Sequence, residues 1–370
     1  MRKVTILGCG NGGRSAASEI ALGGHRVTLY EMPEFAESIA KIKETKVIKA
    51  VGVIEGTANI HQITCDISEA IEDAEVIIVI VPTMFQLTYA RLLAPYLKDG
   101  HNIVLMPGSL GSLEFVEEIR QLGIEKDITV SDFAALPYAT RILNADTVRI
   151  FGRRAVLSMG VFPADKADRV MPIMEDIYPD IITMRDVLEA GLSNPNPTLH
   201  CLGVLLNAGR IEYSHGEFYY YEEGLTPGVC RAVECMDQER VTIGNALNLN
   251  LLSLKDTYPV MKYGPKGDTF WQVIRGVLPL MGVKGPAELD NRYITEDVPI
   301  GLVCYSQLGR QLGVDVKLME SVIHIAGAIL GRDFYENGRT LERCGISGMD
   351  TEALISYVKT GKIVAASAVA

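Results

Sequence analysis

The chain has 370 residues, of which 48% are hydrophobic, and its formal net charge is −11. This length and apolar content predict a large core and two domains, and the acidic balance argues against nucleic acid or an anionic membrane surface as the main partner. Seven scattered cysteines, an odd number, indicate free thiols in a reducing cytoplasm. Cys230 and Cys235 are the closest pair, but they lack a second pair nearby, so we expect no metal site.

The N-terminal residues pass directly into an apolar strand at Val4–Leu7, so we expect no signal peptide. The longest apolar run, Val76–Val81, is far too short to cross a bilayer. It is typical of a strand in a parallel sheet that is covered on both faces.

The stretch after the first strand is rich in glycine and runs into a predicted helix. Glycines at positions 8, 10 and 13 have the spacing of a dinucleotide-binding loop, in which the first permits a tight turn, the second lets the backbone approach a pyrophosphate and the third lets helix and strand pack closely. An ordinary strand-to-helix turn is the alternative explanation. The expected cofactor-binding residues are Gly8, Gly10, Asn11, Gly12, Gly13, Arg14, Glu31, Pro82 and Thr83.

The acidic residue at the end of the second strand indicates which dinucleotide binds. Glu31 follows the strand Arg26–Tyr30 at the interval where a carboxylate binds the adenosine ribose. No Lys or Arg lies between Arg26 and Lys41 to neutralise a 2′-phosphate, so the sequence favours NAD. NADP stays an alternative, because Arg14 at the helix start could hold an extra phosphate.

Further elements of the first half alternate between strands and helices, which predicts an α/β Rossmann domain with a doubly wound parallel sheet. Pro82 and Thr83 follow the strand Val76–Val81 at the edge where ligands bind. The predicted strands are 46–50, 53–57, 102–106, 128–131, 147–151 and 155–159, and the predicted helices are 35–43 and 84–97.

The second half contains few strand signals and long helical windows. These predicted helices cover 197–213, 228–247, 299–312 and 317–330. We therefore expect a Rossmann domain at 1–182 and an all-α domain at 183–370.

Two segments of the second half carry groups suited to proton transfer and anion binding. His200 lies in the opening turn of a helix that Asn196 could cap and Pro197 could begin. The helix dipole disfavours an imidazolium there and a nearby carboxylate would favour it, which suits general acid and base catalysis near neutral pH. A buried structural histidine is an equally good explanation.

The second segment contains Arg292, Asp297 and Pro299, and a helix is predicted to begin near Asp297. Asp297 could orient His200, and Arg292 could bind a substrate carboxylate through two hydrogen bonds. Taken singly, Asp297 would be a helix cap and Arg292 a surface charge. The spacing of these residues does not show that they meet.

Several motifs along the chain resemble those of the octopine/nopaline dehydrogenase family, the opine dehydrogenases, and the likeness covers nearly the whole chain. The motifs lie at 194–200, 205–209, 221–226, 237–240, 292–301, 338–342 and 345–348. The resemblance implies an all-α second domain like that of 6-phosphogluconate dehydrogenase, with the active site between the domains. It also implies that His200 is the acid/base, Asp297 its paired carboxylate and Arg292 the residue that engages a substrate carboxylate.

Such enzymes reductively condense an α-keto acid, often pyruvate, with the amino group of an amino acid. The resemblance therefore implies an NAD(P)-dependent enzyme acting on small molecules, and it leaves a homodimer open. One departure concerns Ala139, where the family pattern after Pro137-Tyr138 often has cysteine, so the preferred amino acid is not defined.

Two other functions are compatible with parts of the sequence. A glycerol-3-phosphate, hydroxyacid or ketopantoate dehydrogenase would share the architecture, but those enzymes use a lysine early in the second domain and this chain has none between Lys166 and Lys255. A protein that senses NAD(H) without catalysis would have no need of His200, Arg292 and Asp297.

Overall fold

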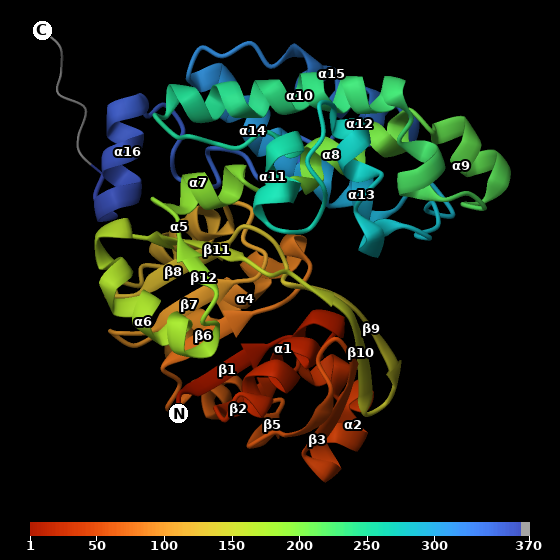
Figure 1. Cartoon of the computed structure of the whole chain (residues 1–370). Coiled ribbons are helices and arrows are strands. Elements are labelled where there is room, and N and C mark those ends of the chain that lie inside the picture. The colour runs from red at the N-terminus through yellow and green to blue at the C-terminus, as the bar shows by residue number, and fades with distance from the viewer. Residues whose placement is uncertain (364–370) are drawn as a thin grey trace, which may run out of the picture. The chain divides into compact units, whose positions relative to one another are not determined.

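The computed structural model describes residues 1–363, which form two compact units. The first comprises Met1–Gly191 and Val358–Gly361, and the second comprises Leu192–Tyr357. Figure 1 shows the strands and helices of both units along the chain. Among the described residues, no helix has both the length and the apolar character that crossing a membrane requires.

An eight-stranded sheet forms the centre of the first unit, in the order β12-β11-β8-β7-β6-β1-β2-β5 (Figure 1). Neighbouring strands are parallel except β8 and β11, which run antiparallel. The strands are β1 (Lys3–Leu7), β2 (Arg26–Tyr30), β5 (Gln62–Thr64), β6 (Val76–Val79), β7 (Asn102–Leu105), β8 (Thr129–Phe133), β11 (Leu157–Phe162) and β12 (Ile181–Thr183).

The central strands are apolar on both faces because helices cover both sides of the sheet. In β6, Val76 and Ile78 join one buried cluster, whereas Ile77 and Val79 join another. This arrangement confirms the predicted doubly wound Rossmann domain. Its helices are α1 (Asn11–Leu22), α2 (Ala36–Thr45), α3 (Ile67–Ile71), α4 (Gln86–Leu93), α5 (Gly111–Gln121), α6 (Ala167–Ile177) and α7 (Val187–Leu192), the last of which ends at the boundary of the unit. Short 3₁₀ turns are η1 (Pro33–Phe35), η2 (Thr83–Phe85), η3 (Ala94–Tyr96) and η4 (Ala164–Lys166).

A second, four-stranded sheet packs against α1, in the order β4-β3-β10-β9. Its strands are β3 (Val47–Gly52), β4 (Gly56–Asn59), β9 (Tyr138–Asn144) and β10 (Thr147–Arg153). The Tyr138 hydroxyl donates to Glu19 of α1 at 2.6 Å, and Arg153 donates to the same carboxylate at 3.1 Å. The sequence predicted three of these strands approximately, but not β9 or their pairing in a separate sheet.

The second unit is all-α, as predicted. Its helices are α8 (Asn196–Leu205), α9 (Ala208–Ser214), α10 (Pro227–Ala246), α11 (Leu254–Val260), α12 (Phe270–Ile274), α13 (Arg292–Thr295), α14 (Val303–Gln311) and α15 (Lys317–Leu330), and α16 (Thr351–Thr360) follows. The 3₁₀ turn η6 (Leu278–Leu280) and the π-helical segments η5 (Tyr220–Gly224) and η7 (Asp297–Leu302) complete it.

The helix predicted over 197–213 is in fact two helices, because the chain breaks at Asn207 between α8 and α9. The Asn207 side chain donates to the carbonyl oxygens of Gly203 and Gly224, at 2.8 and 3.0 Å. A short polar side chain that binds backbone carbonyls in this way competes with a continuous helix.

Candidate active site

The glycine-rich loop connects β1 to α1 at the carboxyl edge of the parallel sheet. Gly8 has φ +99°, a conformation that favours glycine, and a Cβ on Gly13 would lie 1.8 Å from the carbonyl oxygen of Gly8. By contrast, a Cβ on Gly10 would meet no atom within 4 Å. Gly8 and Gly13 therefore shape the loop, and Gly10 leaves an open approach to its backbone, as a bound pyrophosphate requires.

Arg14 has a structural role that the sequence did not predict. Its side chain is buried, and the guanidinium donates to the carbonyl oxygens of Cys9, Ser38 and Ala145 at 3.0, 2.9 and 2.7 Å. These bonds join the glycine loop to α2 and to the β9–β10 connection. The guanidinium therefore has a structural role, and the expectation that Arg14 binds the cofactor or an extra phosphate stays a prediction.

Glu31 lies directly after β2, and its carboxylate binds the backbone of the glycine loop. Its carboxylate accepts hydrogen bonds from the backbone N–H of Cys9 at 2.8 Å and of Met32 at 2.9 Å. The side chain of Asn11, at the start of α1, accepts from the backbone N–H of Ile142 in β9 at 2.7 Å. Glu31 is thus held at the edge where the ribose-binding carboxylate was predicted.

The loops after β6 and β7 reach the same edge of the sheet. Pro82 precedes the turn η2, and Thr83 within this turn is buried. After β7, the backbone N–H and hydroxyl of Ser112 donate to the buried carboxylate of Asp132, at 3.1 and 3.0 Å. The predicted cofactor-binding residues other than Arg14 therefore share one edge of one unit.

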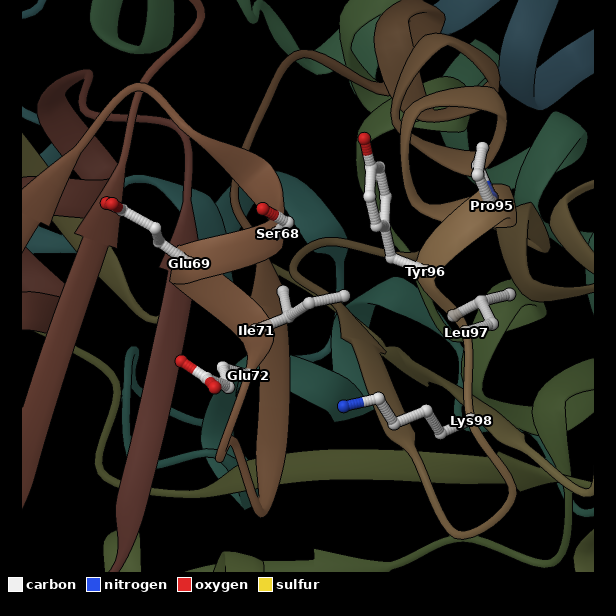
Figure 2. A pocket seen from close by; sticks show the side chains of 8 residues that line it. All are labelled: Ser68, Glu69, Ile71, Glu72, Pro95, Tyr96, Leu97 and Lys98. Atoms are coloured by element: carbon white, nitrogen blue, oxygen red, sulfur yellow. The ribbon is translucent and has the colours of Figure 1, made fainter.

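Two hollows in the first unit lie at opposite ends of the parallel strands. One, of about 560 Å³, adjoins the carboxyl ends of β2 and β5 and includes Tyr30, Thr64 and Lys43 in its lining. The other, of about 440 Å³, lies between α3 and the turn η3 with the two residues after it (Figure 2). These segments lead into the amino ends of β6 and β7. Ligands of such sheets bind beyond the carboxyl ends, so the first hollow adjoins the cofactor edge and the second does not. Lys43 is a positive charge near this edge that the sequence analysis did not single out.

His200 lies in α8 of the second unit, and its side chain is 11% exposed. The expected cap of this helix was wrong: Pro195 is at the cap position, and the Asn194 side chain accepts from the backbone N–H of Asn196 at 3.1 Å. An asparagine two residues upstream therefore satisfies one of the free amides at the helix start.

Asp297 begins the π-helical segment η7 and is not a helix cap, contrary to one expectation from the sequence. Asn291 caps α13 instead, accepting from Tyr293 N–H at 3.0 Å. A Cβ on Gly301 would lie 2.3 Å from Pro197, so glycine lets η7 approach α8 closely. As a result, Asp297 Oδ2 lies 2.8 Å from His200 Nδ1. π-Helical turns occur frequently at functional sites.

Three tyrosines that the sequence analysis did not single out surround His200. The Tyr293 ring stacks on the imidazole with a centroid separation of 4.0 Å and an interplanar angle of 17°. Tyr220 donates through its hydroxyl to the His200 carbonyl oxygen at 3.1 Å, and the Tyr221 hydroxyl lies 3.4 Å from His200 Nε2. Tyr221 and Tyr293 belong to the family motifs quoted above, which is the signal that could have identified them.

Arg292 lies on α13, one helical turn before Asp297. Its side chain is 71% exposed and pairs with Glu296, with Nε donating at 2.7 Å. The positive charge of Arg292 acts on Asp297, favouring its ionised form. An exposed guanidinium with one carboxylate partner keeps donors available for a second anion.

Burial raises the pKa of the Asp297 carboxyl, and the neighbouring His200 charge opposes this shift. A buried carboxylate is stabilised when it pairs with an imidazolium. The arrangement is therefore that of a histidine whose Nδ1 is fixed by a carboxylate and whose Nε2 is directed elsewhere, which is the geometry of a general acid/base.

Another family motif proves to be structural. Arg240 is buried and donates to Asp237 at 2.7 Å and to the carbonyl oxygens of Leu192 and Leu252 at 2.8 and 2.7 Å. Asp237 also accepts from the Leu254 N–H at 2.7 Å. This motif therefore ties α10 to two neighbouring segments.

The fold and these residues are those of an NAD(P)-dependent dehydrogenase with a helical second domain. Comparison with known proteins identifies the family within this class. Residues 183–330 match the family profile of the NAD/NADP octopine/nopaline dehydrogenase α-helical domain, and residues 3–122 match that of the NAD-dependent glycerol-3-phosphate dehydrogenase N-terminus. An opine dehydrogenase from Arthrobacter sp. (strain 1C) is 33% identical over 96% of this chain and 98% of its own.

Solved structures share the fold along its whole length. Octopine dehydrogenase with NADH and L-arginine gives a TM-score of 0.77 at 20% identity, and the same enzyme with NADH and pyruvate gives 0.75 at 20% identity; each match covers 99% of both chains. The chain belongs to the opine dehydrogenase family. It is accordingly an NAD(P)-dependent oxidoreductase of CH–NH bonds, which reductively condenses an α-keto acid with the amino group of an amino acid.

Proposed function

We propose that His200 and Asp297 carry the proton transfers of this condensation, with Arg292 binding a substrate carboxylate and pyruvate as one keto acid the enzyme accepts. The observation that carries the proposal is the 2.8 Å contact between His200 Nδ1 and Asp297 Oδ2, from two segments far apart in the sequence. Such a pair fixes the ring and stabilises its charged form, so that Nε2 can exchange a proton with the reacting groups.

In the proposed sequence, the neutral amino group attacks the keto carbon, a proton passes from the nitrogen to the oxygen, and loss of water leaves a protonated imine. Imidazolium at His200 donates the proton that lets the hydroxyl leave as water, and the carboxylate of Asp297 stabilises the charge of the ring before that transfer. Bound NAD(P)H supplies the hydride that reduces the imine carbon. The product is a secondary amine that carries two carboxylates.

Arg292 suits the substrate because both the keto acid and the amino acid bring a carboxylate. A guanidinium offers several donors in a planar fork that matches a carboxylate. Its partner Glu296 would keep the side chain oriented until the substrate arrives.

We also propose NADH as the preferred cofactor, held by Gly8, Gly10, Asn11, Gly12, Gly13, Glu31, Pro82 and Thr83. The support is the carboxylate of Glu31, which would bind a ribose hydroxyl and repel a 2′-phosphate. Lys43, which lines the adjoining hollow, is a positive charge that could reduce the preference for NADH over NADPH. A cytoplasmic location is proposed because all seven cysteines are free thiols. A homodimer is a further proposal, which sedimentation would test.

The test follows NADH absorbance with purified protein over a matrix of keto acids and amino acids, each also supplied alone. Consumption that needs both substrates is the expected result. His200→Ala should lower kcat at least 100-fold with NADH affinity nearly unchanged. Near-wild-type turnover in this variant would remove His200 from the mechanism, and consumption with a keto acid alone would favour a simpler hydroxyacid dehydrogenase.

A further inference from the structure

The second ring nitrogen of His200 has a partner that the proposed mechanism does not use. Asp297 occupies Nδ1, whereas the hydroxyl of Tyr221 lies 3.4 Å from Nε2. Tyr221 is 4% exposed and comes from the π-helical segment η5. The contact therefore lies inside the helical unit, at the atom expected to exchange the proton.

Neighbouring contacts hold Tyr221 at this place. The adjacent Tyr220 donates to the backbone oxygen of His200 at 3.1 Å, and its backbone N–H donates to the Val283 carbonyl oxygen at 2.8 Å. The rings of Tyr220 and Tyr221 meet edge to face, with centroids 5.0 Å apart. Segment η5 is thus fixed both to α8 and to the chain near Val283. Tyr221 therefore has little freedom to move away from the imidazole of His200.

A hydroxyl is suited to a nitrogen that alternates between two protonation states. It can accept a hydrogen bond from Nε2–H of an imidazolium and donate one to Nε2 of a neutral ring. A carboxylate or an ammonium could serve only one of these states. Burial raises the pKa of Tyr221 well above its ordinary value, so the phenol keeps its proton while the histidine cycles.

Other titratable groups near the ring act on it differently. Tyr293 stacks on one face of the imidazole and hydrogen-bonds to Tyr221. The Cys201 thiol donates to the backbone oxygen of Tyr293 at 3.5 Å. Cys230 of α10 contributes to the raised pKa of Tyr220, of which burial is the main cause. Glu296 and Arg292 act on Asp297, with opposite signs. Asp297 and Tyr221 are the groups that the described residues place in hydrogen-bonding range of the ring nitrogens.

We propose that Tyr221 is a positioning residue, which holds Nε2 of His200 in place through its hydroxyl in both protonation states of the ring. The inference rests on the proposed role of His200. The 3.4 Å separation is long for a hydrogen bond, so an approaching substrate nitrogen or oxygen can share the Nε2 proton without displacing the tyrosine.

The first test compares Tyr221→Phe with Tyr220→Phe, each of which removes one buried hydroxyl and keeps the ring. Tyr221→Phe should lower kcat roughly tenfold to 100-fold, with less change in KM. Because the hydroxyl serves the charged and the neutral ring alike, the limbs of the kcat profile should move little, and the loss of rate should persist across the whole pH range. Tyr220→Phe should lower the unfolding temperature without moving the pH profile, because its hydroxyl bonds to the backbone.

A second measurement does not depend on turnover. The imidazole nitrogens of all six histidines can be followed by ¹⁵N NMR during a pH titration of the full chain, with His200→Gln assigning the signal. The Nε2 signal of His200 should change its chemical shift at both ends of the titration in Tyr221→Phe and stay in place in Tyr220→Phe, because the Tyr221 hydroxyl is the one that faces Nε2. An unmoved Nε2 signal in a folded Tyr221→Phe protein would overturn the inference, even if the proposed substrates are consumed normally. Failure of all substrate pairs with the Nε2 signal shifted would instead reject the proposed function and leave the Tyr221 contact supported.

Discussion

Nδ1 of His200 lies 2.8 Å from Oδ2 of Asp297, although 97 positions separate the two residues in the chain. Asp297→Asn keeps the shape of the side chain and removes its negative charge. We expect kcat to fall roughly 100-fold or more, because the imidazolium loses its counter-charge. Steady-state rates with both substrates at saturation measure this effect, and unchanged kcat would show that the carboxylate is not needed.

The substitution Asp297→Asn should lower kcat, but near neutral pH it should maintain or raise the stability of the fold. Burial raises the pKa of Asp297 in the folded protein, so its ionised form is less favourable there than in the unfolded chain. The folded state therefore binds this proton more tightly, and its stability falls as pH rises through the folded pKa. Asp297→Asn should unfold at or above the wild-type temperature near neutral pH. This advantage should vanish below the unfolded-state pKa of about 3.9, and a marked loss of stability at neutral pH would contradict the argument.

The two halves of the fold differ in how far the sequence predicts them. The glycine loop, Glu31 and the apolar strands carry local signals, because turn geometry and strand burial depend on neighbouring residues. His200 and Asp297 were found through residue type and family motifs, but their contact depends on η7 packing against α8 at Gly301 and Pro197. No local pattern specifies that approach.

The role of a charged side chain was harder to predict than its position. Arg14 follows the glycine loop, as a phosphate ligand could, yet two of its three acceptors, Ser38 and Ala145, come from segments that only the tertiary fold brings to it. The second sheet was missed for a similar reason, since β3 and β10 pair residues near position 50 with residues near 150. Strand β9 pairs with the neighbouring β10 in a hairpin.

Gly10 and Gly13 offer a matched pair of substitutions in one loop. Gly13→Ala would bring a methyl group 1.8 Å from the Gly8 carbonyl oxygen, so the unfolding free energy should fall by about 3 kcal/mol or more. Gly10→Ala meets open space and should fold normally, but its methyl group would obstruct a pyrophosphate on the loop. Fluorescence titration should give at least tenfold weaker NADH binding for Gly10→Ala. Equal NADH affinity in this variant and the wild type would remove Gly10 from the cofactor site.

The seven thiols should differ strongly in reactivity. Cys235 is exposed, whereas burial raises the pKa of Cys9 and of Cys230 to about 12. The thiolate is the reactive form of cysteine, so a disulfide-exchange reagent added to the native protein should label Cys235 first. Cys65, which is partly buried, should follow more slowly. Cys235→Ser should abolish the fast phase, and full denaturation should release seven thiols; a persistent fast phase in Cys235→Ser would mean that another thiol is accessible.

Arg14→Ala tests whether this arginine serves the fold or the cofactor. Three buried or partly buried carbonyl oxygens would lose their donor, so we expect the unfolding free energy to fall by about 3 kcal/mol or more. Arg14→Lys should recover only part of this loss, because one ammonium cannot reproduce the planar fork that reaches three separate segments.

Cofactor preference separates the two roles of Arg14. If the guanidinium only joins backbone segments, the ratio of kcat/KM for NADH and NADPH should stay within about twofold of wild type in Arg14→Lys, whose charge is retained, and in a folded preparation of Arg14→Ala. Lys41→Ala is the matched control, since it removes an exposed positive charge from α2, the helix that Arg14 contacts at Ser38, without breaking buried bonds. A selective loss of NADPH activity in Arg14→Ala that Lys41→Ala does not reproduce would return Arg14 to the phosphate site, because only a direct charge contact would distinguish the two cofactors in this way.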